Sequence, residues 1–243
     1  MSAQVIGWVI RPGSPNRCAI SVNYDFDPQL KPEWGFAAVV ETGGHTLLFD
    51  TGTNGPVLLD NMRKLGIDPH SIEAVILSHE HIDHTGGLQA LLDLGVRPTV
   101  YASSTFLKAF KEKVRAQTKL VEVDDALEIL PGVHTTRTIG STPEQALVPE
   151  TRDGAVVITG CAHPGVVNMV REAQAVAGPK IALLAGGFHL GDTSESKLPL
   201  IVAEVRQVGS REFCPATAQV RRPSTCSATS MRRTTSRVAL GAR

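Results

Sequence analysis

Four side chains that can bind a metal ion fall within six residues of the sequence, between His79 and His84. The segment reads His-Glu-His-Ile-Asp-His, and it directly follows a predicted strand. Imidazole nitrogen is a common ligand of zinc and related metals, and carboxylate oxygen completes many such sites. In an extended loop, residues two apart point the same way, so His79 and His81 can bind one ion together. Asp83 and His84 are offset from this two-residue alternation, so they can face a second ion.

A pair of divalent ions at this segment would support hydrolytic or related chemistry. Two such ions lower the pKa of a bound water, polarise an incoming phosphate or carbonyl, and orient the leaving group. Asp83 can hold a metal and hydrogen-bond the nucleophilic water, so it is the expected catalytic residue. Zinc is the expected metal, and the ligand set also admits iron or manganese. A solvated loop rich in histidine is the alternative, which we disfavour because four ligands rarely coincide at this spacing.

The sequence Ser-His-Glu-His-Ile-Asp-His-Thr-Gly-Gly at 78–87 resembles the HxHxDH signature of the metallo-β-lactamase superfamily. Phe-Asp-Thr-Gly at 49–52 resembles the upstream Asp-Thr-Gly element of the same superfamily. The resemblance implies a four-layer αββα sandwich with two divalent metal ions at one edge of its sheets. It also implies that Asp50 supports the metal loop without binding metal itself. A helix N-cap or turn aspartate is an equally good reading of Asp50 on local grounds.

A later histidine follows a predicted strand and is a further candidate ligand. His163 lies in Gly-Cys-Ala-His-Pro-Gly at 160–165, where Pro164 and Gly165 favour a tight turn at the strand end. The superfamily pattern expects a histidine ligand at the end of a later strand, and His163 fills that place. Cys161 is expected to be a small buried packing residue and not a ligand.

His189 is the last candidate ligand, in Ala-Gly-Gly-Phe-His-Leu at 185–190. Most superfamily members carry a bridging aspartate near this point. Each imidazole nitrogen binds one ion, so we expect His189 to bind one metal or to hydrogen-bond the substrate. Asp192, three residues on, is the less favoured alternative. The remaining histidines lie in predicted turns or loops and are expected to do no chemistry; they are His45, His70 and His134.

The segments around these later histidines also indicate a branch of the superfamily. Gly-Cys-Ala-His-Pro-Gly with Asn168, together with Gly-Gly-Phe-His-Leu at 186–190, resembles the 7,8-dihydropterin-6-methyl-4-(β-D-ribofuranosyl)aminobenzene-5′-phosphate synthase family. The likeness runs from about Trp34 to about Pro215, and it implies a small-molecule substrate that can carry a phosphate. The alternatives are a generic metallo-hydrolase of a phosphoester, thioester or lactone, a non-catalytic metal-binding copy, and a redox protein with a di-iron site.

No histidine follows His189, although the superfamily pattern, and this branch in particular, ends in a further histidine, typically in His-Cys-Thr-Gly. The residues from Ala216 to Val220 can be encoded as GCC ACT GCA CAG GTG, and reading these bases from the third position gives His-Cys-Thr-Gly. Residues 216–243 also contain no Asp or Glu and show no apolar periodicity. We therefore hypothesise that they are a frameshift product, the alternative being a genuine basic tail of low order. As written, the second metal lacks a ligand, and we expect weak activity.

The elements that must position these residues follow from apolar patterning. Gly86 and Gly87 give the backbone freedom to turn out of the metal loop. Early strands come as hairpins and later ones alternate with helices, which suits two sheets packed face to face with helices outside. We expect one domain over 1–215 followed by the tail 216–243. Predicted strands cover 36–41, 46–49, 74–77, 99–102, 146–148, 155–159 and 181–184, with several more between 120 and 139; predicted helices cover 56–65, 88–94, 105–117, 167–176 and 198–208.

Composition limits the remaining classes of function. The chain has 243 residues, 42% of them hydrophobic, with a formal net charge of zero, so neither nucleic acid nor a membrane is an expected partner. No apolar run reaches the length of a membrane span, and the first residues lack the pattern of a signal peptide. The four cysteines have no metal-type spacing, which indicates reduced thiols in a cytoplasmic protein. The sequence does not indicate an oligomeric state.

Overall fold

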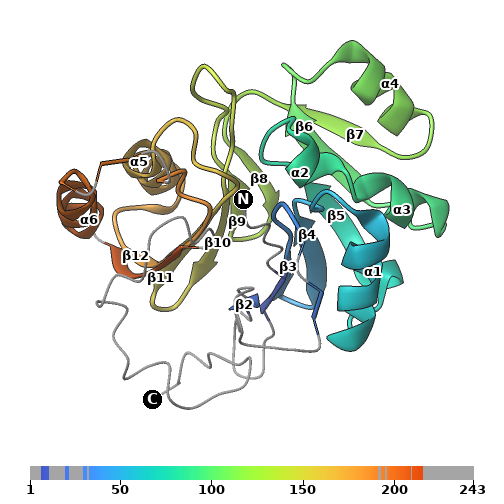
Figure 1. The fold of residues 1–243 in the computed structure, drawn as a ribbon, viewed down its shortest axis with the longest axis horizontal. Coiled ribbons are helices and arrows are strands. Elements are labelled where there is room, and N and C mark those ends of the chain that lie inside the picture. The colour runs from blue at the N-terminus through green and yellow to red at the C-terminus, as the bar shows by residue number, and fades with distance from the viewer. Residues whose placement is uncertain are drawn as a thin grey trace. The chain divides into compact units, whose positions relative to one another are not determined.

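The computed structural model describes residues 7–10, 20–21, 30–31, 33–190, 193–194, 196–208 and 210–215 (Figure 1). The described residues form two compact units that divide between Glu122 and Val123. Each unit contains one β-sheet with helices packed against it. The predicted tail, the proposed frameshift and Asp192 lie outside the described residues.

The sheet of the first unit has seven strands in the order β2-β1-β3-β4-β5-β6-β7. β3 and β4 form the predicted hairpin, in which Gly43 and Gly44 take the positive φ values of 58° and 88° that the tight turn needs. β4, β5 and β6 then run parallel, with Phe49 in register with Ile76. The strands are β1 (Gly7–Ile10), β2 (Ile20–Ser21), β3 (Ala38–Thr42), β4 (His45–Phe49), β5 (Ile72–Ile76), β6 (Thr99–Ser103) and β7 (Leu120–Val123).

Helices cover one face of this sheet through a continuous apolar core. Leu58 of α1, Leu91 of α3 and Val114 of α4 are buried in one cluster with Leu48 and Val75 of the sheet. α1 begins where the Asn54 side chain accepts a hydrogen bond from the backbone N–H of Val57, with a proline in the first turn. The helices are α1 (Gly55–Lys64), the 3₁₀-helix η1 (Pro69–Ser71), α2 (Ile82–Thr85), α3 (Leu88–Asp93) and α4 (Lys108–Arg115).

The sheet of the second unit has six strands in the order β13-β12-β11-β10-β9-β8. Strands β8 to β11 pair antiparallel, whereas β11, β12 and β13 are parallel. Thr159, Gly186 and Pro215 are in register, so the carboxyl ends of these three strands share one edge. The strands are β8 (Leu127–Leu130), β9 (Val133–Thr135), β10 (Leu147–Thr151), β11 (Gly154–Thr159), β12 (Ile181–Gly186) and β13 (Ser210–Pro215).

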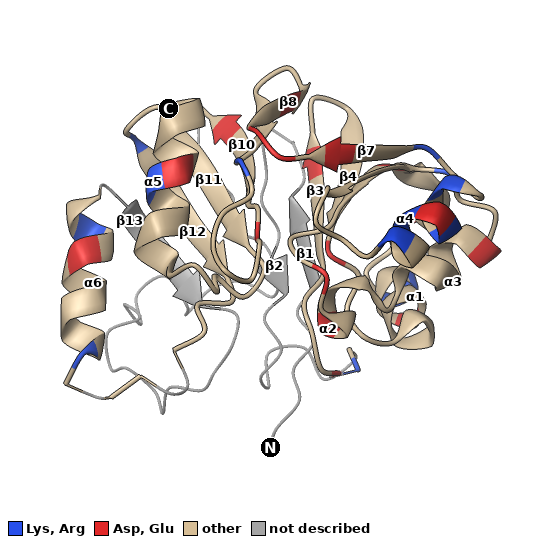
Figure 2. Cartoon of the chain, turned by 90° about the horizontal axis from the view of Figure 1, so that it is seen from above, with Lys and Arg blue, Asp and Glu red and all other residues tan. Residues whose placement is uncertain are grey.

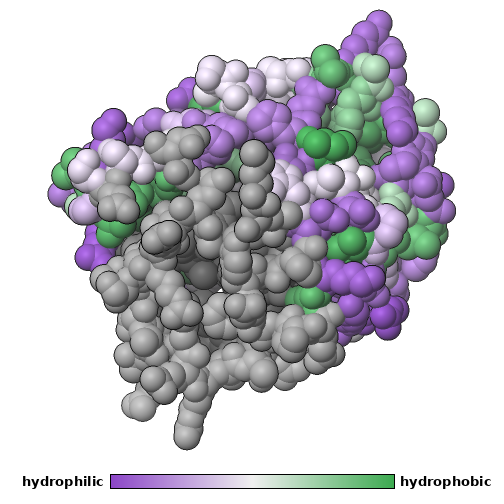
Figure 3. All heavy atoms as spheres, viewed as in Figure 1, coloured by the Kyte–Doolittle hydropathy of each residue, from purple (hydrophilic) through white to green (hydrophobic). Residues whose placement is uncertain are grey.

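Two helices pack on the second sheet, α5 (Val166–Ala177) and α6 (Leu198–Gln207). Met169 and Val205 are buried in one cluster with Val157 and Leu184 of the sheet. Figure 2 shows that α4, α5 and α6 each contain charged residues, as is usual in amphipathic helices. On the face drawn in Figure 3, hydrophilic and hydrophobic residues of the described chain are interspersed.

The predicted elements agree with the structure, with ends that differ by a few residues. Prediction missed β1, β2 and β13, and β1 pairs parallel with β3. Within the described residues, no helix is long and apolar enough to cross a membrane. Sequence patterning predicted a single domain over 1–215, which would contain both units; this stays a prediction.

Candidate metal centre

The predicted ligands of the first unit lie where β5 ends, in the loop 78–81 and in α2. His79 Nε2 is 3.1 Å from His81 Nδ1, and the ring of His79 also lies 4.1 Å, centroid to centroid, from that of His84. His84 Nε2 lies 3.4 Å from Asp83 Oδ2. The structure therefore brings all four predicted side chains of this segment together.

The second half of the motif is helical, which corrects the expectation of one extended loop. His81 has extended backbone angles and is the N-cap of α2, and its carbonyl oxygen accepts hydrogen bonds from His84 and Thr85. Asp83 and His84 therefore lie in the first turn of a helix. The extended geometry holds only up to His81, and the helical turn brings the ring of His84 back over His79.

Asp50, the predicted supporting residue, is fully buried directly after β4. Its Oδ1 accepts the backbone N–H of Ser78 at 2.7 Å, and its Oδ2 contacts Ser78 Oγ at 2.7 Å and His84 Nδ1 at 2.6 Å. Asp50 has a φ of 56°, a left-handed conformation that Asp tolerates better than most residues. It joins the ends of two neighbouring parallel strands, and it is neither a helix N-cap nor an exposed turn residue.

This network sets the tautomers of two histidines. A carboxylate only accepts hydrogen bonds, so His84 must donate from Nδ1, and the Ser78 hydroxyl must donate to Asp50. Because the Ser78 hydroxyl donates its only proton to Asp50, its oxygen must accept the hydrogen bond from His79 Nδ1, at 2.9 Å. In their neutral forms, both histidines then carry the proton on Nδ1 and leave Nε2 unprotonated, which is the form that binds a metal. Sequence analysis missed Ser78, whose only signal is its place directly before the motif.

Burial raises the pKa of both carboxyl groups of this centre, and the neighbouring histidines lower it. Burial raises the pKa of Asp50, although His84 and Ser78 oppose the shift. Burial also raises the pKa of Asp83, but in the metal-free protein the hydrogen bond and the charge of protonated His84 outweigh it and hold that pKa well below its ordinary value. Asp83 is therefore ionised at neutral pH, as a metal ligand must be.

Gly86 and Gly87 are needed for a different reason from the one expected. Both have negative φ values, −65° and −80°, so neither uses the conformational freedom of glycine. A Cβ on Gly86 would lie 2.2 Å from the carbonyl oxygen of Thr53, and one on Gly87 would lie 2.1 Å from that of Thr51. The two glycines let the segment after Asp50 pack directly against the metal loop.

The second unit brings its two predicted ligands together. His163 follows β11 and His189 follows β12, and their rings lie 4.5 Å apart, centroid to centroid. The backbone N–H groups of Ala162 and His163 both donate to the Glu144 carboxylate at 2.9 Å. Glu144 is fully buried, so this carboxylate fixes the loop that carries His163. Sequence analysis missed Glu144, which has no motif around it.

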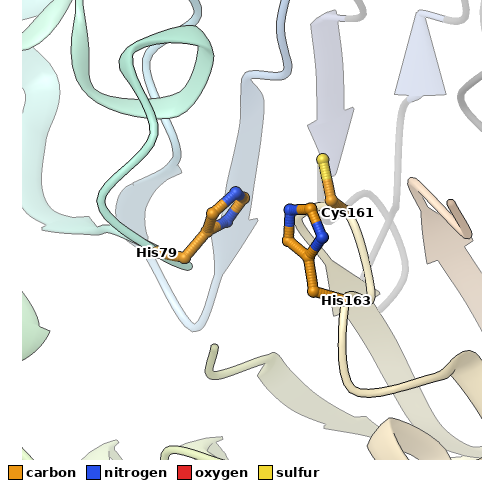
Figure 4. Close-up of side chains that lie close together, drawn as sticks. All are labelled: His79, Cys161 and His163. Atoms are coloured by element: carbon orange, nitrogen blue, oxygen red, sulfur yellow. The ribbon is translucent and has the colours of Figure 1, made fainter. Parts of the chain in front are cut away.

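Cys161 is not the buried packing residue that the sequence predicted. Cys161 is only partly buried, and Figure 4 shows its side chain on the same loop as His163, after β11. Figure 4 also shows His79, at the end of β5 in the first unit. A thiolate is a good zinc ligand, so Cys161 joins the side chains of this loop that could hold a metal ion.

The donor set of the first unit fits a divalent transition metal. Two donors of one tetrahedral zinc ion lie about 3.3 Å apart when each bond is about 2.0 to 2.1 Å long. The separation of 3.1 Å between His79 Nε2 and His81 Nδ1 is close to that spacing, and so is the 3.4 Å between His84 Nε2 and Asp83 Oδ2. Nitrogen with carboxylate oxygen is a donor set that zinc, iron and manganese all accept.

Comparison with known proteins identifies the family. The sequence model of the Metallo-beta-lactamase superfamily matches residues 33–193. The chain is 28% identical to the 7,8-dihydropterin-6-methyl-4-(beta-D-ribofuranosyl)-aminobenzene-5'-phosphate synthase of Methanocaldococcus jannaschii, over 78% of this chain and 83% of that protein.

Solved structures agree with this match at the level of the fold. A metal-dependent hydrolase of the beta-lactamase superfamily superposes with a TM-score of 0.60 at 24% identity, covering 86% of both chains. The short form of human tRNase Z gives a TM-score of 0.52 at 13% identity, covering 78% of this chain and 87% of that one. The expected fold class is confirmed, and the chain belongs to the Metallo-beta-lactamase superfamily.

Proposed function

We propose that the protein is a dinuclear metalloenzyme that resembles the dihydropterin-ribofuranosylaminobenzene-phosphate synthases. The observation that carries the proposal is the cluster of His79, His81, Asp83 and His84 with an unprotonated Nε2 set by Asp50. A solvated histidine-rich loop would not need a buried carboxylate to fix its tautomers. The two ions are zinc in this proposal, with iron and manganese as the alternatives.

The ligands divide between the two ions according to the superfamily pattern. His79, His81 and His163 would form the first set, and three protein ligands are typical of a catalytic zinc ion that also binds water. Asp83 and His84 would form the second set, with His189 in place of the usual bridging aspartate. An imidazole nitrogen binds one ion, so in this proposal His189 would serve the second ion alone.

The residues of this chain then have distinct roles in the reaction. Bound divalent ions would lower the pKa of a water molecule and polarise a phosphate or carbonyl of the substrate. Asp83 accepts a hydrogen bond from the attacking water, which orients a lone pair toward the substrate. Asp50 keeps His84 in its binding tautomer, and Ser78 does the same for His79. Glu144 holds the backbone of His163.

The proposed substrate is a small molecule that carries a phosphate. Similarity to the archaeal synthase over 78% of this chain supports that class. Hydrolysis of a phosphoester, thioester or lactone is the second candidate, because the chain shares its fold with a metal-dependent hydrolase. A substrate panel assayed with and without chelator separates the two.

The end of β13 bears on the proposed frameshift. β13 ends at Pro215, in register with Gly186 of β12 and at the same edge as Thr159 of β11. His163 and His189 follow those two strands. A histidine encoded directly after Pro215 would follow the third strand of the same edge, as the His-Cys-Thr-Gly reading requires. Sequencing the gene around the Pro215 codon tests the proposal, and it fails if no single-base shift restores His-Cys-Thr-Gly.

Counting metals in the purified protein tests the proposed function. Elemental analysis should give two ions per chain, whereas one ion or none would favour a degenerate, non-catalytic copy. His81→Ala should lose metal, whereas His70→Ala is the matched control, because His70 is exposed and lies outside the cluster. Activity should disappear with a chelator and return with zinc, iron or manganese. Absence of bound metal under metal-replete conditions would refute the enzyme and favour a non-catalytic copy.

A further inference from the structure

A three-residue segment, Trp34 to Phe36, holds Asp83 with two hydrogen bonds. The indole Nε1–H of Trp34 donates to Asp83 Oδ2 at 3.0 Å. The backbone N–H of Phe36 donates to the carbonyl oxygen of Asp83, also at 3.0 Å. Gly35 lies between them with a φ of 116°, and a Cβ there would be 2.0 Å from the same carbonyl oxygen. We call residues 34–36 the Asp83 clasp.

The clasp is itself anchored to the segment after Asp50. The carbonyl oxygen of Trp34 accepts hydrogen bonds from the Oγ1 of Thr53 at 2.6 Å and from its backbone N–H at 3.3 Å. The backbone N–H of Gly52 donates to the carbonyl oxygen of Phe36 at 2.8 Å. The backbone that carries the indole is therefore held in place by contacts that do not involve the ring.

The ring of Trp34 contributes little packing, because the residue is 46% exposed. Its hydrogen bond to a carboxylate is charge-assisted and so among the stronger kinds. The outer torsion of an aspartate side chain has a broad, shallow minimum, so packing alone does not fix its oxygens. The indole donor can fix them, because it donates to Oδ2, the same oxygen that lies 3.4 Å from His84 Nε2.

We infer that Trp34 is a positioning residue that acts through Asp83. Its indole N–H holds the carboxylate in the orientation that receives a metal ion together with His84. The inference rests on the proposed function, since it assigns a residue to the second metal set. Nothing in the motif itself marks Trp34, which lies 49 positions before Asp83.

Zinc binding to the metal-free protein tests this role. Trp34→Phe keeps an aromatic ring but removes the N–H donor, and Trp8→Phe is the matched control at the only other tryptophan. Loss of an outer partner of a metal ligand weakens binding by about 10- to 100-fold. We expect that loss for one ion in Trp34→Phe, with the other ion and the urea midpoint unchanged, and wild-type affinities in Trp8→Phe. Chelator competition measures the affinities.

The indole itself provides a second readout that does not depend on activity. In Trp8→Phe protein, the single indole N–H signal in a ¹H–¹⁵N spectrum belongs to Trp34, and it should move when Asp83→Ala removes the acceptor. Trp34→Phe with wild-type zinc affinity, or an indole signal that Asp83→Ala leaves in place, overturns the inference and leaves the metal proposal standing. An unsubstituted protein that binds no zinc overturns both.

Discussion

Replacing Asp50 with asparagine should weaken metal binding without unfolding the protein. The two side chains have the same shape, and both tolerate the φ of 56° at this position. The amide oxygen can still accept the backbone N–H of Ser78. The amide nitrogen must then occupy the place of Oδ2, which lies 2.6 Å from His84 Nδ1 and 2.7 Å from Ser78 Oγ.

The predicted magnitude follows from the change of donor and acceptor. An amide N–H facing His84 Nδ1 needs an acceptor there, so the imidazole proton moves to Nε2. A metal can bind Nε2 only if that proton returns to Nδ1, which leaves two buried donors facing each other. A buried donor without a partner costs about 1–3 kcal/mol, and each 1.4 kcal/mol is tenfold in affinity. Asp50→Asn should therefore bind the second ion about 5- to 150-fold more weakly.

Two measurements separate this effect from general damage. Chelator competition gives the zinc affinity, and ¹⁵N chemical shifts of the histidine rings give the tautomer of His84. Asp50→Ala is the contrasting variant, because it leaves the Ser78 and His84 donors unsatisfied and places alanine at positive φ. It should lose about 3 kcal/mol or more of unfolding free energy. Asp50→Asn with unchanged zinc affinity and a proton still on Nδ1 would refute the reasoning.

Two further predictions concern the second unit. Glu144→Ala should lower the unfolding free energy by about 2–6 kcal/mol, because it leaves the backbone N–H groups of Ala162 and His163 without their carboxylate, and urea denaturation measures the loss. A Glu144→Ala protein as stable as wild type would show that water replaces the carboxylate. Glu172→Gln should cost at most about 1 kcal/mol at pH 7, because the partner Arg137 is 58% exposed. The hydrogen bonds and charge of Arg137 lower the pKa of Glu172, so this stabilisation is present above the unfolded pKa of about 4.3 and is lost as the pH falls through the lower folded pKa. Wild-type and Glu172→Gln unfolding energies should therefore differ at pH 7 and converge at low pH, and a difference that persists there would contradict the assignment.

The fold was accessible from the sequence because its elements have strong local signals. The hairpin of β3 and β4 has a Gly-Gly turn between apolar runs, and the parallel strands β4, β6, β11 and β12 are each followed by a helix with clear apolar spacing. β1 and β13 were missed for physical reasons. The hairpin partner of Gly7–Ile10 is β2, which is only two residues long, so this run has no second strand pattern beside it in the sequence. Ser210–Pro215 carries charged residues and a proline, which are not typical of a strand. Their pairing depends on partners distant in sequence.

The metal-binding side chains could be predicted where several of them lie close together in the sequence. Six residues carry His79, His81, Asp83 and His84, and residues so close in sequence are held near each other by the chain itself. The supporting groups have no such signal. Ser78, Trp34 and Glu144 are ordinary residue types, and each acts through a backbone or side chain that only the tertiary structure brings to it.

The supporting groups also explain why the motif alone does not define a functional site. His79 and His84 would each exchange between two tautomers in an unstructured loop, and only one of these presents Nε2 to a metal. Asp50 fixes the tautomer of His84 directly, and it fixes that of His79 through Ser78. The same fully buried carboxylate also joins the ends of β4 and β5, so it serves the fold as well as the histidines. Asp50→Asn is therefore the sharpest test of the metal centre, because it keeps the backbone contact to Ser78 and changes the histidine tautomer that a metal needs.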